Sequence, residues 1–236
     1  MSVLMSALIG CGTGILGTGL GGVFAAGIRR IRNVKRTEMF LLGLSGGVMA
    51  AVVVFELIPE AAAFSDLADT ALYFASGAII TALLSKLIPK KSGRLGIMML
   101  AGIALHNFPE GLAVGAGLSE PDSFGLRLGF LIMLHDVPEG LAIGIPLKNE
   151  GMSCLKTITM CALSGLPTAI GAAAGYIIGG ISPVFVGGSV AFAAGAMLYL
   201  AVLELIPECI KKGALADTAV SVAAGFAAGA VCCAVL

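Results

Sequence analysis

The sequence predicts an all-α membrane protein, a bundle of eight transmembrane helices that forms a single domain over residues 1–236. Two observations predict this class. Hydrophobic residues make up 58% of the chain and charged residues only 12%, whereas a soluble domain is nearer half apolar and a quarter charged. The apolar residues also gather in long runs that match the roughly 20 residues a helix needs to cross a bilayer.

Eight apolar runs separated by short polar connections are expected to be these spans. Because a backbone in contact with lipid must satisfy its own hydrogen bonds, each run should be a helix. Alternating β-barrel strands of about ten residues do not fit runs of this length. The predicted spans cover residues 3–28, 39–57, 70–87, 95–118, 124–147, 155–178, 184–206 and 218–236.

Some of the runs carry further signals. No basic segment precedes the first run, so we expect a retained span rather than a cleaved signal peptide. Glycine is abundant, with 34 residues, and recurs at short spacing in the first and sixth runs. Such patterns are typical of helices that pack closely through small residues, whereas a phosphate-binding loop would need a soluble strand-to-helix context.

The Lys and Arg residues predict how the chain lies in the membrane. With the N-terminus outside, the connections after spans one, three, five and seven face the cytoplasm and hold thirteen of the 14 Lys and Arg residues. Only Arg127 then lies outside. Since positive residues concentrate on the cytoplasmic side, both termini are expected outside a plasma membrane of the bacterial inner type. Zero net charge and the lack of a basic stripe give no reason to expect nucleic acid as a partner.

Two pairs of similar hexapeptides indicate an inverted repeat. Residues 55–60 end span two and residues 203–208 end span seven, on opposite sides of the membrane. Residues 106–111 (His-Asn-Phe-Pro-Glu-Gly) on span four match residues 135–140 (His-Asp-Val-Pro-Glu-Gly) on span five, which runs the other way. Both pairs fit one pseudo-twofold axis in the membrane plane, with spans one to three repeated as six to eight around a central pair. This 3+2+3 arrangement with a midplane site is typical of secondary transporters.

The hexapeptides on spans four and five carry the candidate chemistry. His and Glu lie four residues apart in each, so they share one helix face. Both pairs fall near the middle of the bilayer, where a carboxylate costs about 2.5–3.5 kcal/mol and no Lys or Arg is at hand. Either a bound cation or protons must balance these groups, and a purely structural His–Glu pair is the alternative. The candidate metal ligands are His106, Asn107, Glu110, His135, Asp136 and Glu139.

Each Glu of this set faces two neighbouring ion positions. One position combines both His with both Glu, a mixed nitrogen and oxygen set that suits Zn²⁺, Fe²⁺, Co²⁺ or Mn²⁺. The other combines Asn107 and Asp136 with the same two Glu and is less selective. Pro109 and Pro138 each free a backbone carbonyl, either for the ion or as part of a simple kink.

These motifs, with eight spans and outside termini, resemble the ZIP family (Zrt-/Irt-like proteins) of metal transporters over the whole chain. The resemblance implies uptake of divalent metal into the cytoplasm by alternating access, with zinc foremost and iron, manganese, cobalt or cadmium as further substrates. The metal is then cargo, and no cofactor is expected. A homodimer in the bilayer is also implied, with spans one, four, five and six moving against the others. The resemblance places the metal ligands on the same six residues.

Five further residues are candidates for the ion pathway. Many relatives in the family have a Glu on span six, and Thr168 stands there in this chain. Glu56 and Glu204 occupy symmetric places one turn before a proline, either at an entrance and exit or simply as carboxylates at helix ends. Met99 shares a face with His106, and Ser164 is a candidate on family analogy alone. Met99 is otherwise a core or lipid-facing residue.

Two other classes of protein compete with a transporter that is not an enzyme. An intramembrane metalloenzyme would hold iron or zinc with the same His and Glu cluster. A di-iron bundle requires Glu-x-x-His pairs with further Glu, and a metalloprotease requires His-Glu-x-x-His, neither of which the sequence contains. A purely structural membrane protein leaves the midplane carboxylates unexplained.

Overall fold

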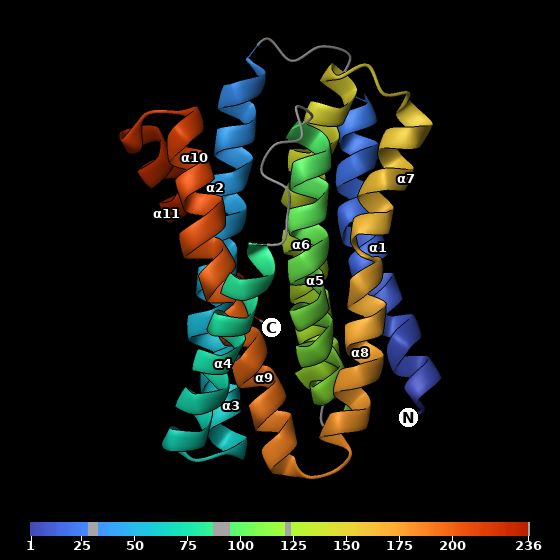
Figure 1. Cartoon of the computed structure of the whole chain (residues 1–236), viewed down its shortest axis with the longest axis vertical. Coiled ribbons are helices and arrows are strands. Elements are labelled where there is room, and N and C mark those ends of the chain that lie inside the picture. The colour runs from blue at the N-terminus through green and yellow to red at the C-terminus, as the bar shows by residue number, and fades with distance from the viewer. Residues whose placement is uncertain (28–32, 87–94, 121–123, 236) are drawn as a thin grey trace.

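The computed structural model of the chain describes residues 1–27, 33–86, 95–120 and 124–235, without the side chains of residues 34, 95–99, 101, 105 and 106. The described residues form helices joined by short connections and contain no strand, which confirms the all-α class for this part of the chain (Figure 1). The elements are α1 (Val3–Gly27), α2 (Val34–Val52), η1 (Val53–Leu57), α3 (Ile58–Phe64), α4 (Leu67–Ser85), α5 (Leu95–Ser119), α6 (Phe124–Asn149), α7 (Cys154–Ser164), α8 (Leu166–Gly179), α9 (Pro183–Leu200), η2 (Ala201–Leu205), α10 (Ile206–Lys212) and α11 (Leu215–Val235), where η marks a π-helical segment.

Seven segments among the described residues are long and apolar enough to cross a membrane, and they correspond to seven of the eight predicted spans. The remaining predicted span is α5, which has 25 residues, as α1 has. At 1.5 Å per residue such a helix extends about 37 Å, more than the roughly 30 Å of hydrocarbon in a bilayer. The length of α5 therefore also suffices for a crossing.

The second and seventh predicted spans continue past their expected ends as α3 and α10. In each rod a five-residue π-helical segment comes just before a proline, Pro59 after η1 and Pro207 after η2. In a regular α-helix the proline ring collides with the carbonyl four residues back. The wider turn, closed by the Ile58 N–H on the Val53 carbonyl, relieves that collision and lets the rod continue.

The sixth predicted span is two helices rather than one. α7 ends at Ser164, and α8 begins at Leu166 after Gly165. Pro167 lies in the first turn of α8, where its missing N–H needs no partner. It therefore cannot continue the hydrogen-bond ladder of α7, which accounts for the break.

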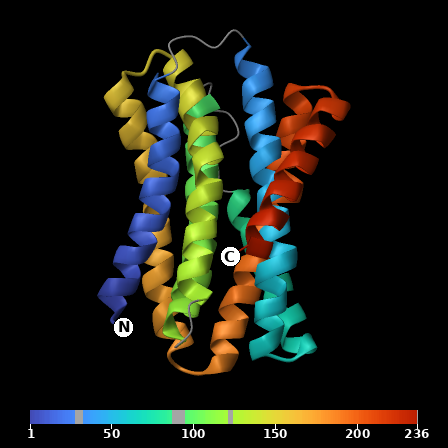
Figure 2. The same cartoon turned by 180° about the vertical axis from the view of Figure 1, so that it is seen from behind.

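Glycines set which helices lie side by side. α5 packs against α8, and α1 packs against α6. A Cβ added at Gly111 would overlap the backbone oxygen of Thr168, and one added at Gly140 would overlap that of Thr18. These helices therefore touch through their backbones. Figures 1 and 2 show the four helices together on one side of the bundle.

The other side of the bundle repeats this packing with a second set of helices. α4 packs against α9, and α2 packs against α11. A Cβ at Gly77 would overlap the Phe192 oxygen, and a Cβ at Gly225 would overlap the Leu44 oxygen. α4 and α11 also begin with the same five residues, Leu-Ala-Asp-Thr-Ala, a match that the two hexapeptide pairs do not include.

The apolar contacts of α6 fall into two zones, one on each side of its hexapeptide. Phe124, Leu128 and Ile132 belong to the largest buried cluster, which joins α2, η1, α3, α5, α6 and α9. Ala142 and Ile143 belong to two smaller clusters nearer the other end of the helix. The polar residues of the hexapeptide on α6 lie between these zones.

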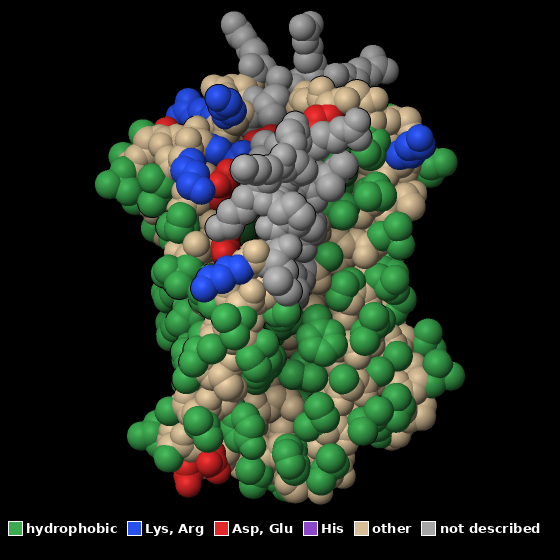
Figure 3. Space-filling model, viewed as in Figure 1, with side chains coloured by type: hydrophobic (Ala, Val, Ile, Leu, Met, Phe, Trp, Pro, Cys, Tyr) green, Lys and Arg blue, Asp and Glu red, His purple; other side chains and the backbone are tan. Residues whose placement is uncertain are grey.

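Charged side chains distinguish the two ends of the bundle. In Figure 3 the Lys and Arg side chains gather toward the end where α2 begins, with acidic side chains among them, whereas only acidic side chains are seen at the opposite end. The basic connections that contain residues 28–32 and 87–94 lie outside the described residues. We call the end that carries Arg36, Lys211 and Lys212 the basic end.

The backbone contact between α5 and α8 leads to a prediction on stability. Gly115→Ala should lower the free energy of unfolding by about 1–3 kcal/mol, because its methyl group would overlap the Ala172 oxygen. Gly12→Ala is the matched control, since a Cβ there meets nothing within 4 Å and alanine favours a helix. Thermal unfolding of the detergent-solubilised variants measures both. Equal melting temperatures for the two variants would contradict the close packing.

Candidate metal site

The two matching hexapeptides lie in the middle of α5 and α6, which pack against each other. Both helices run on through their central prolines, Pro109 and Pro138. Neither proline breaks its helix, so each removes a backbone hydrogen bond within a continuous rod. The facing residues of the two motifs can therefore approach each other across one interface.

Three side chains of this interface form a compact cluster. His135 Nε2 lies 3.0 Å from Glu110 Oε1 on the neighbouring helix and 3.6 Å from Asp136 Oδ1. One possible ligand atom from each of the three residues lies within 4.8 Å of the others. All three residues are at most 2% exposed. The cluster contains one imidazole nitrogen and oxygens from two carboxylates, a donor set that suits a transition-metal ion.

Several polar atoms of this cluster lack hydrogen-bond partners among the described residues. They are Glu110 Oε2, His135 Nδ1 and both carboxylate oxygens of Asp136. In the same part of the chain no Lys or Arg pairs with Glu110 or Asp136. Buried charges without a partner cost several kcal/mol each. A divalent cation would satisfy the open oxygens and offset the negative charge.

Asn107 is fixed one turn before Glu110 by a contact to a third helix. Its Nδ2 donates a 2.8 Å hydrogen bond to the backbone oxygen of Ser164, the last residue of α7. That oxygen lacks a partner within its own helix because α7 ends there. The Asn107 side chain is fully buried, and its Oδ1 has no partner among the described residues. The amide is thus oriented, and its oxygen stays open for an ion.

Ser164 contributes to the site through its backbone rather than its hydroxyl group. The hydroxyl donates a 2.6 Å hydrogen bond to the Cys161 oxygen in its own helix. Sequence reasoning missed this role of the carbonyl. The signal for it was Pro167, which ends α7 and leaves the last carbonyls of that helix without donors.

Two more predicted residues are buried beside the cluster. Glu139 is 1% exposed and follows His135 by one helical turn on the same face of α6. Thr168 lies in α8, where Gly14 of α1 and Gly111 of α5 come close to it. Its hydroxyl has no partner among the described residues, and α8 contains no carboxylate.

The remaining predicted residues are not brought into this cluster by any described contact. Glu56 lies in η1 and Glu204 in η2, both in the interior of a rod and therefore not at a helix end. Glu56 has the guanidinium of Arg127 as an electrostatic neighbour. His106 and Met99 lie in α5, but their side chains are outside the described part of the chain.

Comparison with known proteins supports the family that the paired motifs indicate. A family model described as "ZIP Zinc transporter" matches residues 89–236, which include both hexapeptides of α5 and α6. The chain belongs to the ZIP family. The expected resemblance is thus confirmed.

Relatives within the ZIP family extend the match over most of the chain. "Zinc transporter ZupT" of Corynebacterium glutamicum is 31% identical over 92% of this chain and 93% of that protein. The protein of the same name from Chlorobium chlorochromatii is 33% identical over 73% of this chain and 76% of its own length. "Zinc transporter GufA" of Myxococcus xanthus is 39% identical over 50% of this chain and 46% of that protein.

The contact between Asn107 and the end of α7 predicts a stability effect in the metal-free protein. Asn107→Ala should lower the free energy of unfolding by about 1–3 kcal/mol, because the buried Ser164 oxygen loses its donor. Asn149→Ala removes a similar 2.8 Å bond, to the Ile145 oxygen, in a partly exposed position and should cost less. Thermal unfolding in the presence of a chelator compares them. A smaller loss for the Asn107 variant would contradict this role.

Proposed function

We propose that this protein carries divalent transition-metal ions, zinc foremost, through the membrane by way of the site between α5 and α6. The observation that carries the proposal is the buried group of Glu110, His135 and Asp136 on two facing helices. In the middle of an apolar bundle these groups need protons or a bound cation to balance their charge. Asn107, Glu139 and His106 complete the proposed ligand set, which follows from the hexapeptide match.

Family membership favours transport over the metalloenzyme alternative. The ZIP family is one of transporters, and the relatives that match most of this chain are named zinc transporters. The chain is therefore a metal transporter of the membrane rather than an enzyme. The metal is its substrate, so the site binds cargo and not a resident cofactor.

The donor set of the site suits several borderline metals. An imidazole nitrogen with carboxylate oxygens binds Zn²⁺, and also Fe²⁺, Co²⁺ and Mn²⁺, better than it binds Ca²⁺ or Mg²⁺. The names of the relatives favour zinc among these ions. Iron, manganese, cobalt and cadmium are the further substrates to be compared with zinc in the uptake experiment below.

We infer alternating access between two inverted halves, and pairs of equivalent contacts support this inference. A Cβ added at Gly47 would overlap the Val222 oxygen, and one added at Gly195 would overlap the Phe74 oxygen. The offset between the hexapeptides at residues 55–60 and 203–208 relates Gly47 to Gly195 and Phe74 to Val222, so the two contacts are equivalent. The pairings of α5 with α8 and of α1 with α6 also correspond. These relations fit spans one to three repeated as six to eight around α5 and α6.

The apolar zones of α6 support the proposal that the ion path is closed on one side of the metal site. The largest cluster lies between the site and the end of α6 that holds Phe124. The clusters on the other side of the site are smaller. In the proposed mechanism the ion leaves toward the basic end, and the large cluster must open when an ion enters.

We propose that the basic end faces the cytoplasm and that both termini lie outside a bacterial inner membrane. The gathering of Lys and Arg at this end supports the orientation (Figure 3). Transport toward the basic end is then uptake. The homodimer implied by the family resemblance stays a prediction, since the structure holds one chain.

Metal uptake into proteoliposomes tests the proposed function. With a metal-sensitive dye trapped inside, the native chain should take up Zn²⁺, and Fe²⁺, Co²⁺, Mn²⁺ and Cd²⁺ are offered separately to rank the substrates. His135→Ala and Glu110→Gln should each reduce the initial rate of uptake by about 10–100-fold or more. Loss of a residue that only hydrogen-bonds a metal ligand already lowers metal affinity or activity by that factor.

The matched control for these variants is Glu208→Gln, which removes an equally acidic side chain from the surface pair with Lys211. It should retain native uptake. A well-folded native protein that moves no metal in either direction, with or without a pH gradient, would refute transport. Loss of uptake in the control alone would refute the assigned site.

The exposed Cys154 gives a test of orientation. This residue begins α7, and its Sγ lies 3.2 Å from the Nζ of Lys148 in the last turn of α6. A membrane-impermeant maleimide should label it in everted vesicles and leave it unlabelled in intact cells. Cys154→Ser identifies which signal belongs to this thiol. Labelling in intact cells that disappears in this variant would reverse the proposed orientation.

A further inference from the structure

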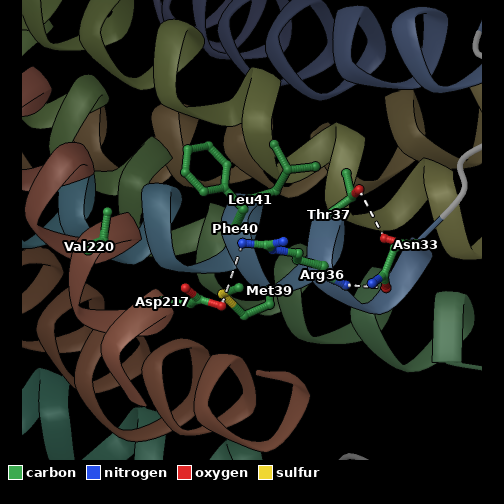
Figure 4. Close-up of a pocket in the computed structure, with 8 residues that line it drawn as sticks. All are labelled: Asn33, Arg36, Thr37, Met39, Phe40, Leu41, Asp217 and Val220. Atoms are coloured by element: carbon green, nitrogen blue, oxygen red, sulfur yellow. Dashed lines mark hydrogen bonds and ion pairs between the residues drawn. The ribbon is translucent and has the colours of Figure 1, made fainter. Parts of the chain in front are cut away.

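A pocket of about 400 Å³ lies where α2 and α11 begin, outside the candidate metal site (Figure 4). Its volume falls within the roughly 300–1,000 Å³ of small-molecule sites. The pocket is not lined by any of the proposed metal ligands. Its lining consists of Asn33, Arg36, Thr37, Met39, Phe40, Leu41, Asp217 and Val220.

The polar side of the pocket carries one positive and one negative group. Arg36 reaches from α2 toward Asp217 of α11, with 3.9 Å between the nearest guanidinium nitrogen and carboxylate oxygen (Figure 4). This distance is too long for a hydrogen bond. The two side chains are 70% and 47% exposed. Both groups therefore keep hydrogen-bonding capacity for a ligand that carries two opposite charges.

The backbone around Arg36 is held by local hydrogen bonds. The Asn33 side chain accepts a 3.2 Å bond from the Arg36 N–H and caps α2. The Thr37 hydroxyl donates a 3.1 Å bond to the Asn33 oxygen. The start of α2 is thus fixed, so the backbone from which the Arg36 side chain projects has a defined position.

The apolar side of the pocket lies deeper along the same two helices. Phe40 comes one turn after Arg36 in α2, and Val220 comes one turn after Asp217 in α11. Phe40 is 45% exposed, so its aromatic ring is open to the pocket and to the surrounding lipid. Both helices are candidate membrane spans that begin at the basic end. The pocket is therefore polar at the membrane surface and apolar toward the hydrocarbon.

The charged pair is not part of the repeated framework of the protein. Counted from the matching hexapeptides, Asp69 at the start of α4 corresponds to Asp217, and Val184 of α9 corresponds to Arg36. The opposite end thus keeps the acid and has no base at this place. The pair of opposite charges at this pocket is therefore confined to the basic end.

We propose that this pocket binds a phospholipid with an ethanolamine head group, from the leaflet at the basic end. Its phosphate lies on Arg36, its ammonium group on Asp217, and one acyl chain along Phe40 and Val220. A phosphoglycerol head group lacks the cation for Asp217. A choline head group carries no N–H donor for that carboxylate. The apolar wall selects the intact lipid over a free head group.

Native mass spectrometry of the full chain in detergent tests the proposal. Ethanolamine, choline and glycerol phospholipids with identical acyl chains are added at equal concentration. The native chain should retain the ethanolamine lipid about two- to fivefold better than the other two, the range that one exposed ion pair supplies. Equal retention of all three lipids would overturn the proposal.

Variants separate the two charged contacts. Asp217→Asn should lower retention of the ethanolamine lipid to that of the choline lipid, and Asp217→Glu should restore the preference. Arg36→Gln should weaken all three lipids. Lys211→Gln removes a cation that does not line the pocket from the same end of the bundle and should change nothing. A preference that persists in the Asp217→Asn chain would overturn the assignment.

Two further measurements exclude trivial results. Each variant should show native melting temperature and zinc uptake, so that lost retention is not a loss of fold. Soluble glycerophosphoethanolamine, added at the lipid's concentration, should not displace the lipid because it lacks the acyl chains. Full displacement would show that the head group alone is the ligand and would refute the commitment to a membrane lipid.

Discussion

The cost of burying carboxylates in an apolar bundle is the constraint on which the rest of this structure depends. Glu110 and Asp136 lie at the centre without a Lys or Arg partner among the described residues, and the imidazole of His135 lies beside both. Such an arrangement is stable only with protons or a bound cation to balance the charge. The helices around it must therefore hold the ligand atoms close together while admitting an ion. In a family of metal transporters, holding ligand atoms close together while admitting an ion is what transport requires.

Close backbone contact between helices provides this arrangement. The glycine that ends each hexapeptide, Gly111 or Gly140, follows directly after a buried Glu and touches the backbone of Thr168 or Thr18. The same short segment thus carries the ligand and the contact that positions its helix. The break of α7 at Ser164 adds a carbonyl that orients Asn107. Chemistry and packing cannot be separated in these motifs, which explains why both occur in one hexapeptide.

The two ends of the bundle differ although its halves share a packing pattern. At the basic end Lys212 Nζ lies 2.8 Å from Glu38 Oε2, and these side chains are 9% and 1% exposed. At the opposite end the corresponding residues are Val186, which is buried in the large apolar cluster, and Phe64, which packs against that cluster. A buried ion pair is weak evidence for stability. Together with the Arg36–Asp217 pair, it makes one end of a repeated framework chemically distinct.

The sequence by itself determined the helical class, the approximate spans and the two paired motifs, because apolar runs and the spacing of His and Glu are local properties of the chain. It also led to the ZIP family. It did not show the π-helical turns before Pro59 and Pro207, or the role of the Ser164 carbonyl. Tertiary structure decided these features, because a carbonyl left free by one helix becomes informative only when another helix brings a donor to it. The approach of Glu110 to His135 depends likewise on how α5 packs against α6, a long-range contact that no single segment encodes.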